Sequence, residues 1–182
     1  MKQEHLFTPD CIRTNTGQYV NVINPDPSTI LIEDIAHGLA GQLRFGAQSP
    51  IRYTVAQHCV ECARHTEGDK FEALMHDASE AYLGDMASPI KQHLPDYKVL
   101  EEKFSIVIAN KFGYNYPYHS LTKLADINAL KWEWDAVMLA GTHPPNTIYL
   151  VEAWSAERAK EEFLKMFHEL DILRKESVTW VQ

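Results

Sequence analysis

The residues best suited to chemistry lie in one short stretch, where His76 and Asp77 are adjacent and Glu80 follows about one helical turn after His76. Apolar residues flank the pair, which predicts a largely buried helix. Burying an imidazole and two carboxylates costs several kcal/mol unless something compensates their charge. A divalent metal ion supplies that compensation, because it pairs with carboxylates and accepts neutral imidazole as a ligand. A helix whose polar face merely happens to be rich in His, Asp and Glu explains this segment equally well.

Two distant segments favour the metal interpretation. His58 lies in the apolar helical run 53–60, and Asp126 lies in another such run, 123–130. Alone, each is more often a satisfied polar group of a core than a ligand. In the order His, His-Asp, Asp, however, the segments offer two imidazoles and two carboxylates from three helices. This mixed set suits Mn, Fe, Co, Ni or Zn rather than an all-oxygen Ca or Mg site. We therefore expect one divalent transition metal ion, held by His58, His76, Asp77 and Asp126.

A single all-α domain is the simplest fold that positions these residues. Residues 1–27 are expected to form a short irregular extension with a β-like run at 19–23, and residues 28–182 the helical domain. Hydrophobic periodicity predicts helices at about 28–43, 54–65, 70–83, 96–112, 120–140 and 158–173. Ser28 or Thr29 is expected to cap the first of these helices, and Ser120 the fifth. Gly141, Pro144 and Pro145 are expected to end the fifth helix.

Composition narrows the class of protein. The chain has 182 residues, 45% of them hydrophobic, and a formal net charge of −8. An acidic surface repels a polynucleotide backbone, so duplex binding is not expected, although a small anionic nucleotide is compatible with local arginines and a metal. No apolar run approaches the ~20 residues of a membrane span, and the first residues lack signal-peptide character. Three cysteines (Cys11, Cys59 and Cys62) favour a reducing compartment, the cytoplasm. The Cys59–Cys62 pair is a minor candidate for a zinc site, because no second pair accompanies it.

The pattern H…HD…D resembles that of the HD-domain metal-dependent phosphohydrolases. It is similar in particular to the bacterial 5′-deoxynucleotidases and to the short phage and bacterial HD phosphohydrolases, which include a phage dATP triphosphohydrolase. The resemblance covers roughly residues 20–140. Its specific part is the run from His76 to Glu80 that continues to Gly84-Asp85, with the flanking His and Asp. The segments that carry it are 34–39, 55–58, 76–85, 89–91 and 123–126.

The resemblance implies a single HD-domain helical bundle and assigns roles within it. Glu80 would act as general acid or base, although a supporting contact to a ligand imidazole is the alternative. Asp85 would contact the sugar hydroxyl and serve the reaction from there, or else it caps backbone amides after Gly84. Arg44 would bind phosphate. Phe45 would pack on the deoxyribose, at a position where the family has Trp.

Three further residues are weaker substrate-binding candidates. Arg52 and Lys91 are additional candidates for phosphate contacts, and His37 is expected on the apolar face of the first helix with a possible role in the pocket. The expected activity is that of a phage-type dNTP (dATP) triphosphohydrolase using a metal-activated water. A 5′-deoxynucleotidase acting on dNMPs and a non-catalytic nucleotide-sensing HD module remain the alternatives. We expect the protein to form a homo-oligomer, a dimer or higher, in the bacterial cytoplasm. Its gene could come from the host or from a phage.

Overall fold

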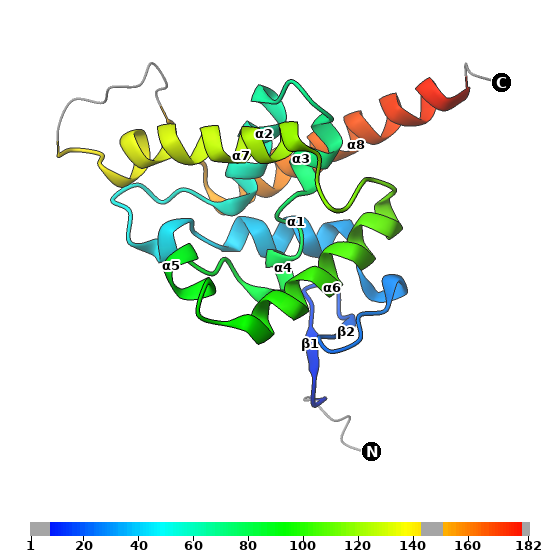
Figure 1. Ribbon diagram of the computed structural model, residues 1–182. Coiled ribbons are helices and arrows are strands. Elements are labelled where there is room, and N and C mark those ends of the chain that lie inside the picture. Colours follow the sequence, from blue (N-terminus) through cyan, green and yellow to red (C-terminus); the bar gives the residue numbers. More distant parts are fainter. Residues whose placement is uncertain (1–7, 143–150, 180–182) are drawn as a thin grey trace.

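The computed structural model describes residues 8–142 and 151–179, which form a mostly helical chain with one small two-stranded sheet (Figure 1). This confirms the all-α class in broad outline. The opening residues and the prolines at 144 and 145, on which two expectations rested, lie outside the described residues. The α-helices are α1 (Ile32–Gly41), α2 (Val55–His65), α3 (Lys70–Met75), α4 (Glu80–Leu83), α5 (Ser88–Lys91), α6 (Pro95–Phe112), α7 (Ser120–Glu133) and α8 (Ala156–Thr179).

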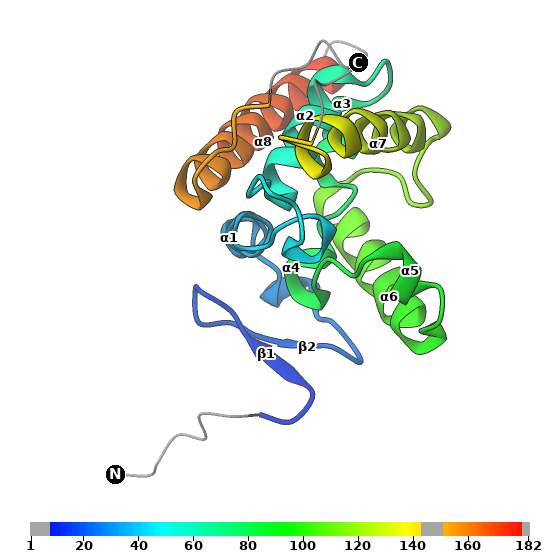
Figure 2. The ribbon, with the colours of Figure 1, turned by 90° about the vertical axis from the view of Figure 1, so that its left-hand side faces the viewer.

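The core lies around α1, which packs against α2, α4 and α8. Ile35, Leu39, Val60, Leu74 and Phe163 are fully buried there, one or two from each of α1, α2, α3 and α8. Helix α7 crosses on the outer side of α2 and α3, far from the hairpin of β1 (Cys11–Arg13) and β2 (Tyr19–Asn21) (Figures 1 and 2). In the described residues, no helix is both long and apolar enough to cross a membrane.

The N-terminal segment is attached to the core by its hairpin. The expected β-like run forms strand β2, which pairs antiparallel with β1. Val20 is fully buried in the core cluster. The backbone N–H and the hydroxyl of Thr16 donate to the two carboxylate oxygens of Asp34 on α1, at 2.9 and 2.6 Å. Whether residues 1–27 and 28–182 are separate units stays a prediction.

Both predicted helix caps are wrong. Ser28 and Thr29 lie in a 3-10 turn (Pro27–Thr29) capped by Asp26, and α1 begins only after Leu31. Ser120 is the first residue of α7 rather than its cap, and the preceding residue His119 donates its backbone N–H to Oε1 of Glu72 at 2.6 Å. A buried carboxylate from α3 therefore replaces the local cap, since an anion beside a helix N-terminus satisfies its free amides and its dipole.

The expected continuous helix over 70–83 is interrupted at the His-Asp pair. Helix α3 ends at Met75, and α4 begins at Glu80. The turn between them is closed by tighter bonds, for example from the Ala78 N–H to the Met75 carbonyl at 3.0 Å. The hydroxyl of Tyr118 donates to the His76 carbonyl at 2.6 Å, which satisfies an oxygen that the interruption leaves without a helical partner. A side chain distant in sequence thus stabilises the break.

The last two helices also differ from their predictions. Helix α7 stops at Glu133 and continues as a π-helix (Trp134–Met138), in which the Leu139 N–H donates to the Trp134 carbonyl at 3.0 Å. Helix α8 extends beyond the expected 158–173 at both ends. The Ser155 hydroxyl accepts the Arg158 N–H at 3.2 Å, as a capping side chain does.

Candidate metal centre

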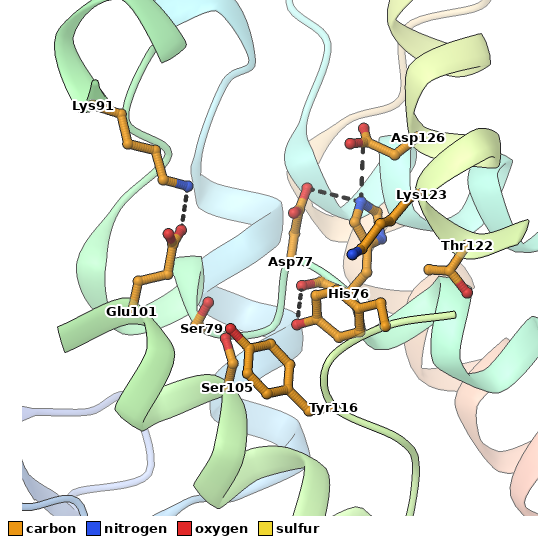
Figure 3. Close-up of a pocket in the computed structure, with 11 residues that line it drawn as sticks. His76, Asp77, Ser79, Lys91, Glu101, Ser105, Tyr116, Thr122, Lys123 and Asp126 are labelled. Carbon is orange, nitrogen blue, oxygen red and sulfur yellow. Dashed lines mark hydrogen bonds and ion pairs between the residues drawn. The ribbon is translucent and has the colours of Figure 1, made fainter. Parts of the chain in front are cut away.

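The structure brings together all four predicted metal ligands, from α2, the turn after α3, and α7. Figure 3 shows three of them, His76, Asp77 and Asp126. Nε2 of His58 lies 3.3 Å from Nε2 of His76 and 3.3 Å from Oδ1 of Asp126. Oδ2 of Asp77 lies 3.5 Å from the first imidazole nitrogen and 3.3 Å from the second. The two histidines are buried, whereas the Asp126 side chain is 43% exposed. The cluster is therefore open to a ligand on the α7 side.

Hydrogen bonds on the far side of each imidazole fix which nitrogen faces the cluster. Nδ1 of His76 donates to the Ala73 carbonyl at 2.8 Å, and Nδ1 of His58 donates to Oε1 of Glu133 at 2.6 Å. When both rings are neutral, as histidine ligands of a metal are, each presents its Nε2 lone pair to the other. Two facing lone pairs repel unless a cation lies between them. Histidine ligands of metals are commonly oriented in this way, by a carboxylate or a carbonyl behind the ring.

The charges and spacings fit a cation as well. Oδ2 of Asp77 is buried and makes no hydrogen bond. Two ligand atoms that each lie about 2.1 Å from an ion are about 3.0 Å apart at a right angle and about 3.4 Å apart at a tetrahedral angle. The separations of 3.3–3.5 Å in the cluster are of this size, and that between His76 and Asp126 is wider, at 3.9 Å, so these residues could hold a metal ion.

Both cysteines of the C-x-x-C pair border the cluster, but on different sides. Sγ of Cys62 lies 3.6 Å from Nε2 of His58, and it belongs to a group of potential ligand atoms that includes His76 and Asp126. Cys59 groups instead with His76 and Asp77. Among the described residues, the two thiols therefore belong to different groups of potential ligands, and each adds a soft donor beside nitrogen and oxygen atoms. The spacing of Cys62, one turn after His58 on α2, was the signal available in the sequence.

Sequence reasoning missed Glu133, which supports the cluster from behind. Its side chain is fully buried, and besides His58 it contacts Arg44, whose Nη2 donates to Oε2 at 3.0 Å. Burial alone would raise the pKa of Glu133, but His58 and Arg44 lower it to about 2. Nη1 of Arg44 also lies 3.8 Å from Oδ2 of Asp77. The predicted phosphate-binding arginine thus lies beside the metal ligands, and its buried Nε has no partner.

The predicted acid or base Glu80 is buried at the start of α4, next to the cluster. Its Oε2 has no hydrogen-bond partner. Burial raises the pKa of Glu80 well above its ordinary value, and the charges of Asp77 and Asp85 raise it further. Gln42, which sequence reasoning also missed, holds this region. Its amide donates to the Glu80 carbonyl at 2.8 Å and accepts the Asp85 N–H at 2.6 Å. A buried carboxyl of this kind is suited to proton transfer.

One cavity borders the cluster, and a second lies beside Arg44. A polar cavity of about 180 Å³ is lined by three of the predicted ligands and by two lysines, one of which, Lys91, is paired with Glu101 (Figure 3). The second lysine is Lys123, which comes from α7 together with Asp126. A mainly apolar cavity of about 700 Å³ is lined by Arg44, Phe45 and Asp85, together with side chains from the end of α7 and the π-helix. The candidate lysines thus lie in the polar cavity, whereas Arg44 lines the apolar cavity together with the sugar candidates Phe45 and Asp85.

A strained turn carries Phe45 into the apolar cavity. Phe45, Gly46 and Ala47 have φ values of +58°, +59° and +61°. Only glycine adopts this left-handed conformation freely, and other residues lose about 1–2 kcal/mol there. The turn is held at its base by a hydrogen bond from the Arg44 N–H to the Tyr53 carbonyl at 2.9 Å. Strain of this kind is often found at binding sites.

Two predicted residues are not brought to the cluster. His37 is exposed on α1 and lines a different cavity, beside the N-terminal hairpin, so its expected place on an apolar helix face is wrong. Helical periodicity turns Ile35, Ala36 and Leu39 inward and leaves position 37 outside. Arg52 is exposed two residues before Thr54, the cap of α2, and lines neither of the cavities at the cluster.

Comparison with known proteins yields relatives but no activity. No family model matches the chain. The uncharacterized protein YfdR of Escherichia coli (strain K12) is 36% identical over 178 residues, an alignment that covers 90% of this chain and 97% of YfdR. An uncharacterized protein of Rhodobacter capsulatus is 35% identical over 112 residues, which is 56% of this chain and 57% of that protein. On the evidence of the nearly full-length match, the chain belongs to the family of YfdR.

Proposed function

We propose that this protein is an HD-domain metal-dependent phosphohydrolase of deoxynucleotides, with a deoxynucleoside triphosphate such as dATP as its preferred substrate. The observation that carries the proposal is that Asp77 and Asp126 each lie 3.3–3.9 Å from the Nε2 atoms of both His58 and His76, with Arg44 beside them. A buried cation site next to an arginine is suited to a phosphoryl group, because guanidinium matches phosphate oxygens.

The four ligands would hold the ion, which when bound activates a water and neutralises charge on the phosphoryl group. The protein's own groups would do the rest. Arg44 would bind the α-phosphate and keep it in place, while Glu133 holds the arginine and His58 in position. Water adds at the α-phosphorus, and the bond to the 5′ oxygen of the sugar breaks. Glu80, whose raised pKa favours the protonated form, would donate its proton to that leaving oxygen.

The polar cavity supports a triphosphate over a monophosphate. It begins at His76, Asp77 and Asp126 and continues between Lys91 and Lys123, on the side of the cluster where Asp126 is exposed. A β,γ-phosphate tail beyond the ion would meet Lys123 there, and it would compete with Glu101 for Lys91. Attack at the α-phosphorus would then release inorganic triphosphate, whereas the same attack on a monophosphate releases orthophosphate.

A 5′-deoxynucleotidase is the second candidate. Arg44, Phe45 and Asp85 line one cavity, so they fit the phosphate and sugar of a monophosphate without any use of the polar cavity. A non-catalytic sensing module with the same ligands would bind the nucleotide and release it unchanged. The two enzymes differ in product, and the module differs from both in having no product.

The test is to incubate metal-loaded protein, with Mn²⁺ or Co²⁺, with mono-, di- and triphosphates of deoxy- and ribonucleosides and to separate the products by chromatography. We expect dATP to give deoxyadenosine and triphosphate, and Asp77→Ala to give neither. Release of orthophosphate from dAMP alone would favour the nucleotidase. Binding without turnover for every compound would leave only the sensing module.

A further inference from the structure

Trp134 is a large apolar side chain held at the surface, where the α-helix changes into the π-helix. Its side chain is 49% exposed, whereas the preceding residue Glu133 is fully buried. Short π-helical segments recur at functional sites, because the extra residue changes the direction in which the following side chains point. In this chain, the change occurs directly after the residue that supports His58 and Arg44.

The indole of Trp134 faces the strained turn at Phe45. The two ring centroids are 6.1 Å apart, and the rings are inclined at 73°, an edge-on arrangement. Both rings line the apolar cavity of about 700 Å³, a size typical of pockets that take a small molecule. The same cavity is lined by Arg44 and Asp85, and the other side chains on it are mostly apolar, namely Met86, Ala87, Pro89, Leu130 and Met138.

The position of Arg44 gives this cavity a direction. The guanidinium lies 3.8 Å from Asp77 of the metal cluster, and it also borders the apolar cavity. A ligand whose phosphate is held between the cluster and Arg44 therefore extends its opposite end toward the rings of Phe45 and Trp134. In a nucleotide, that opposite end is an aromatic base. Every base has a flat aromatic face that can stack on indole, so stacking does not depend on which base it is.

We propose that Trp134 stacks against the base of the nucleotide, so that the apolar cavity is the base subsite of this protein. The inference rests on the proposed function, which it extends from the phosphate and the sugar to the base. Phe45, one residue after Arg44, is then the neighbour of the sugar, and its edge contact holds the indole in place. Loss of base stacking weakens binding by roughly 5- to 150-fold.

The first experiment compares substrates with and without a base. We measure kcat/KM for a deoxynucleotide and for the base-free 2-deoxyribose 5-phosphate with the same number of phosphates, in wild type, Trp134→Ala and Trp134→Phe. The ratio of the two values should fall roughly 5- to 150-fold in Trp134→Ala and recover largely in Trp134→Phe, which keeps a stacking ring. Trp132→Phe is the matched control, because Trp132 packs edge-on against Tyr53 and lines other cavities.

The second experiment measures binding without turnover. Deoxynucleotide should quench the tryptophan fluorescence of metal-loaded wild type and of Trp132→Phe, but not that of Trp134→Phe. If no compound is hydrolysed but this quenching pattern holds, the proposed activity fails and the base subsite stands. If Trp134→Ala lowers turnover of both substrates equally, or if quenching persists in Trp134→Phe, the base subsite is refuted. Trp134→Phe keeps an aromatic ring at this position opposite Phe45, and its thermal unfolding temperature, compared with that of wild type, separates misfolding from lost stacking.

Discussion

Replacing Glu133 by Gln should weaken metal binding, although Glu133 is not itself a ligand. Its carboxylate accepts the Nδ1 proton of His58 at 2.6 Å and a guanidinium proton of Arg44 at 3.0 Å. The amide keeps the shape of the side chain but removes its negative charge. That charge makes the imidazole of His58 more basic, and therefore a stronger ligand of the metal. Loss of such a partner typically costs 10- to 100-fold in metal affinity, or about 1.4–2.7 kcal/mol.

The assay is titration calorimetry of chelator-stripped protein with Mn²⁺. Glu61→Gln is the control. Glu61 lies on α2, the helix of His58, but its carboxylate pairs with Arg64 at 2.8 Å. We expect the control to bind as wild type does. Arg44 loses a buried charged partner in the variant, so the variant should also be less stable. Thermal unfolding in the presence of a chelator measures this loss of stability separately from the loss of metal affinity. An unchanged dissociation constant in Glu133→Gln, with the fold intact, would refute the supporting role of this carboxylate.

Three further outcomes are expected. A methyl group added at Gly38 would lie 2.7 Å from the Ala81 carbonyl oxygen and must displace α4, so Gly38→Ala should lower the urea-unfolding free energy by about 1–3 kcal/mol. Gly41→Ala on the same helix meets nothing within 4 Å and should be neutral or stabilising in the same measurement. Glu80→Gln should retain bound metal by elemental analysis and lose ~100- to 10,000-fold in kcat on the best substrate. Lys123→Ala should raise KM for dATP more than for dAMP in steady-state assays. Equal increases for the two substrates would show that Lys123 does not contact the β- and γ-phosphates.

The candidate metal ligands were predictable because their signal is local. Polar residues inside apolar helical runs are recognisable from the sequence alone, because they interrupt the hydrophobic pattern. Four such residues are His58, His76, Asp77 and Asp126. The structure confirms that they meet. Glu133 carries no such signal, because it lies between two tryptophans in a run that also contains Lys131 and Asp135. Its burial depends on how α7 lies across α2, which is a property of the tertiary packing.

The errors in the predicted elements have the same origin. The caps at Ser120 and the uninterrupted helix at the His-Asp pair were argued from neighbours in sequence, whereas Glu72 and Tyr118 act from a distance. Helix propensity is a weak preference that such contacts override. The π-helix after Glu133 has no sequence signature of this kind, so the position of Trp134 was not predicted. Roles of Arg44, Asp85 and Glu80 in a reaction stay predictions.

The placement of Asp126 and Glu133 on α7 has a consequence for recognising distant relatives. The two residues are seven apart, which is close to two full helical turns, so both face the buried histidines. A single insertion or deletion between them would rotate one carboxylate by about 100° away from the cluster. Homologous chains that keep the ion should therefore conserve this interval even where the intervening letters change. An alignment gap at this place would mark a lineage in which the centre has been lost.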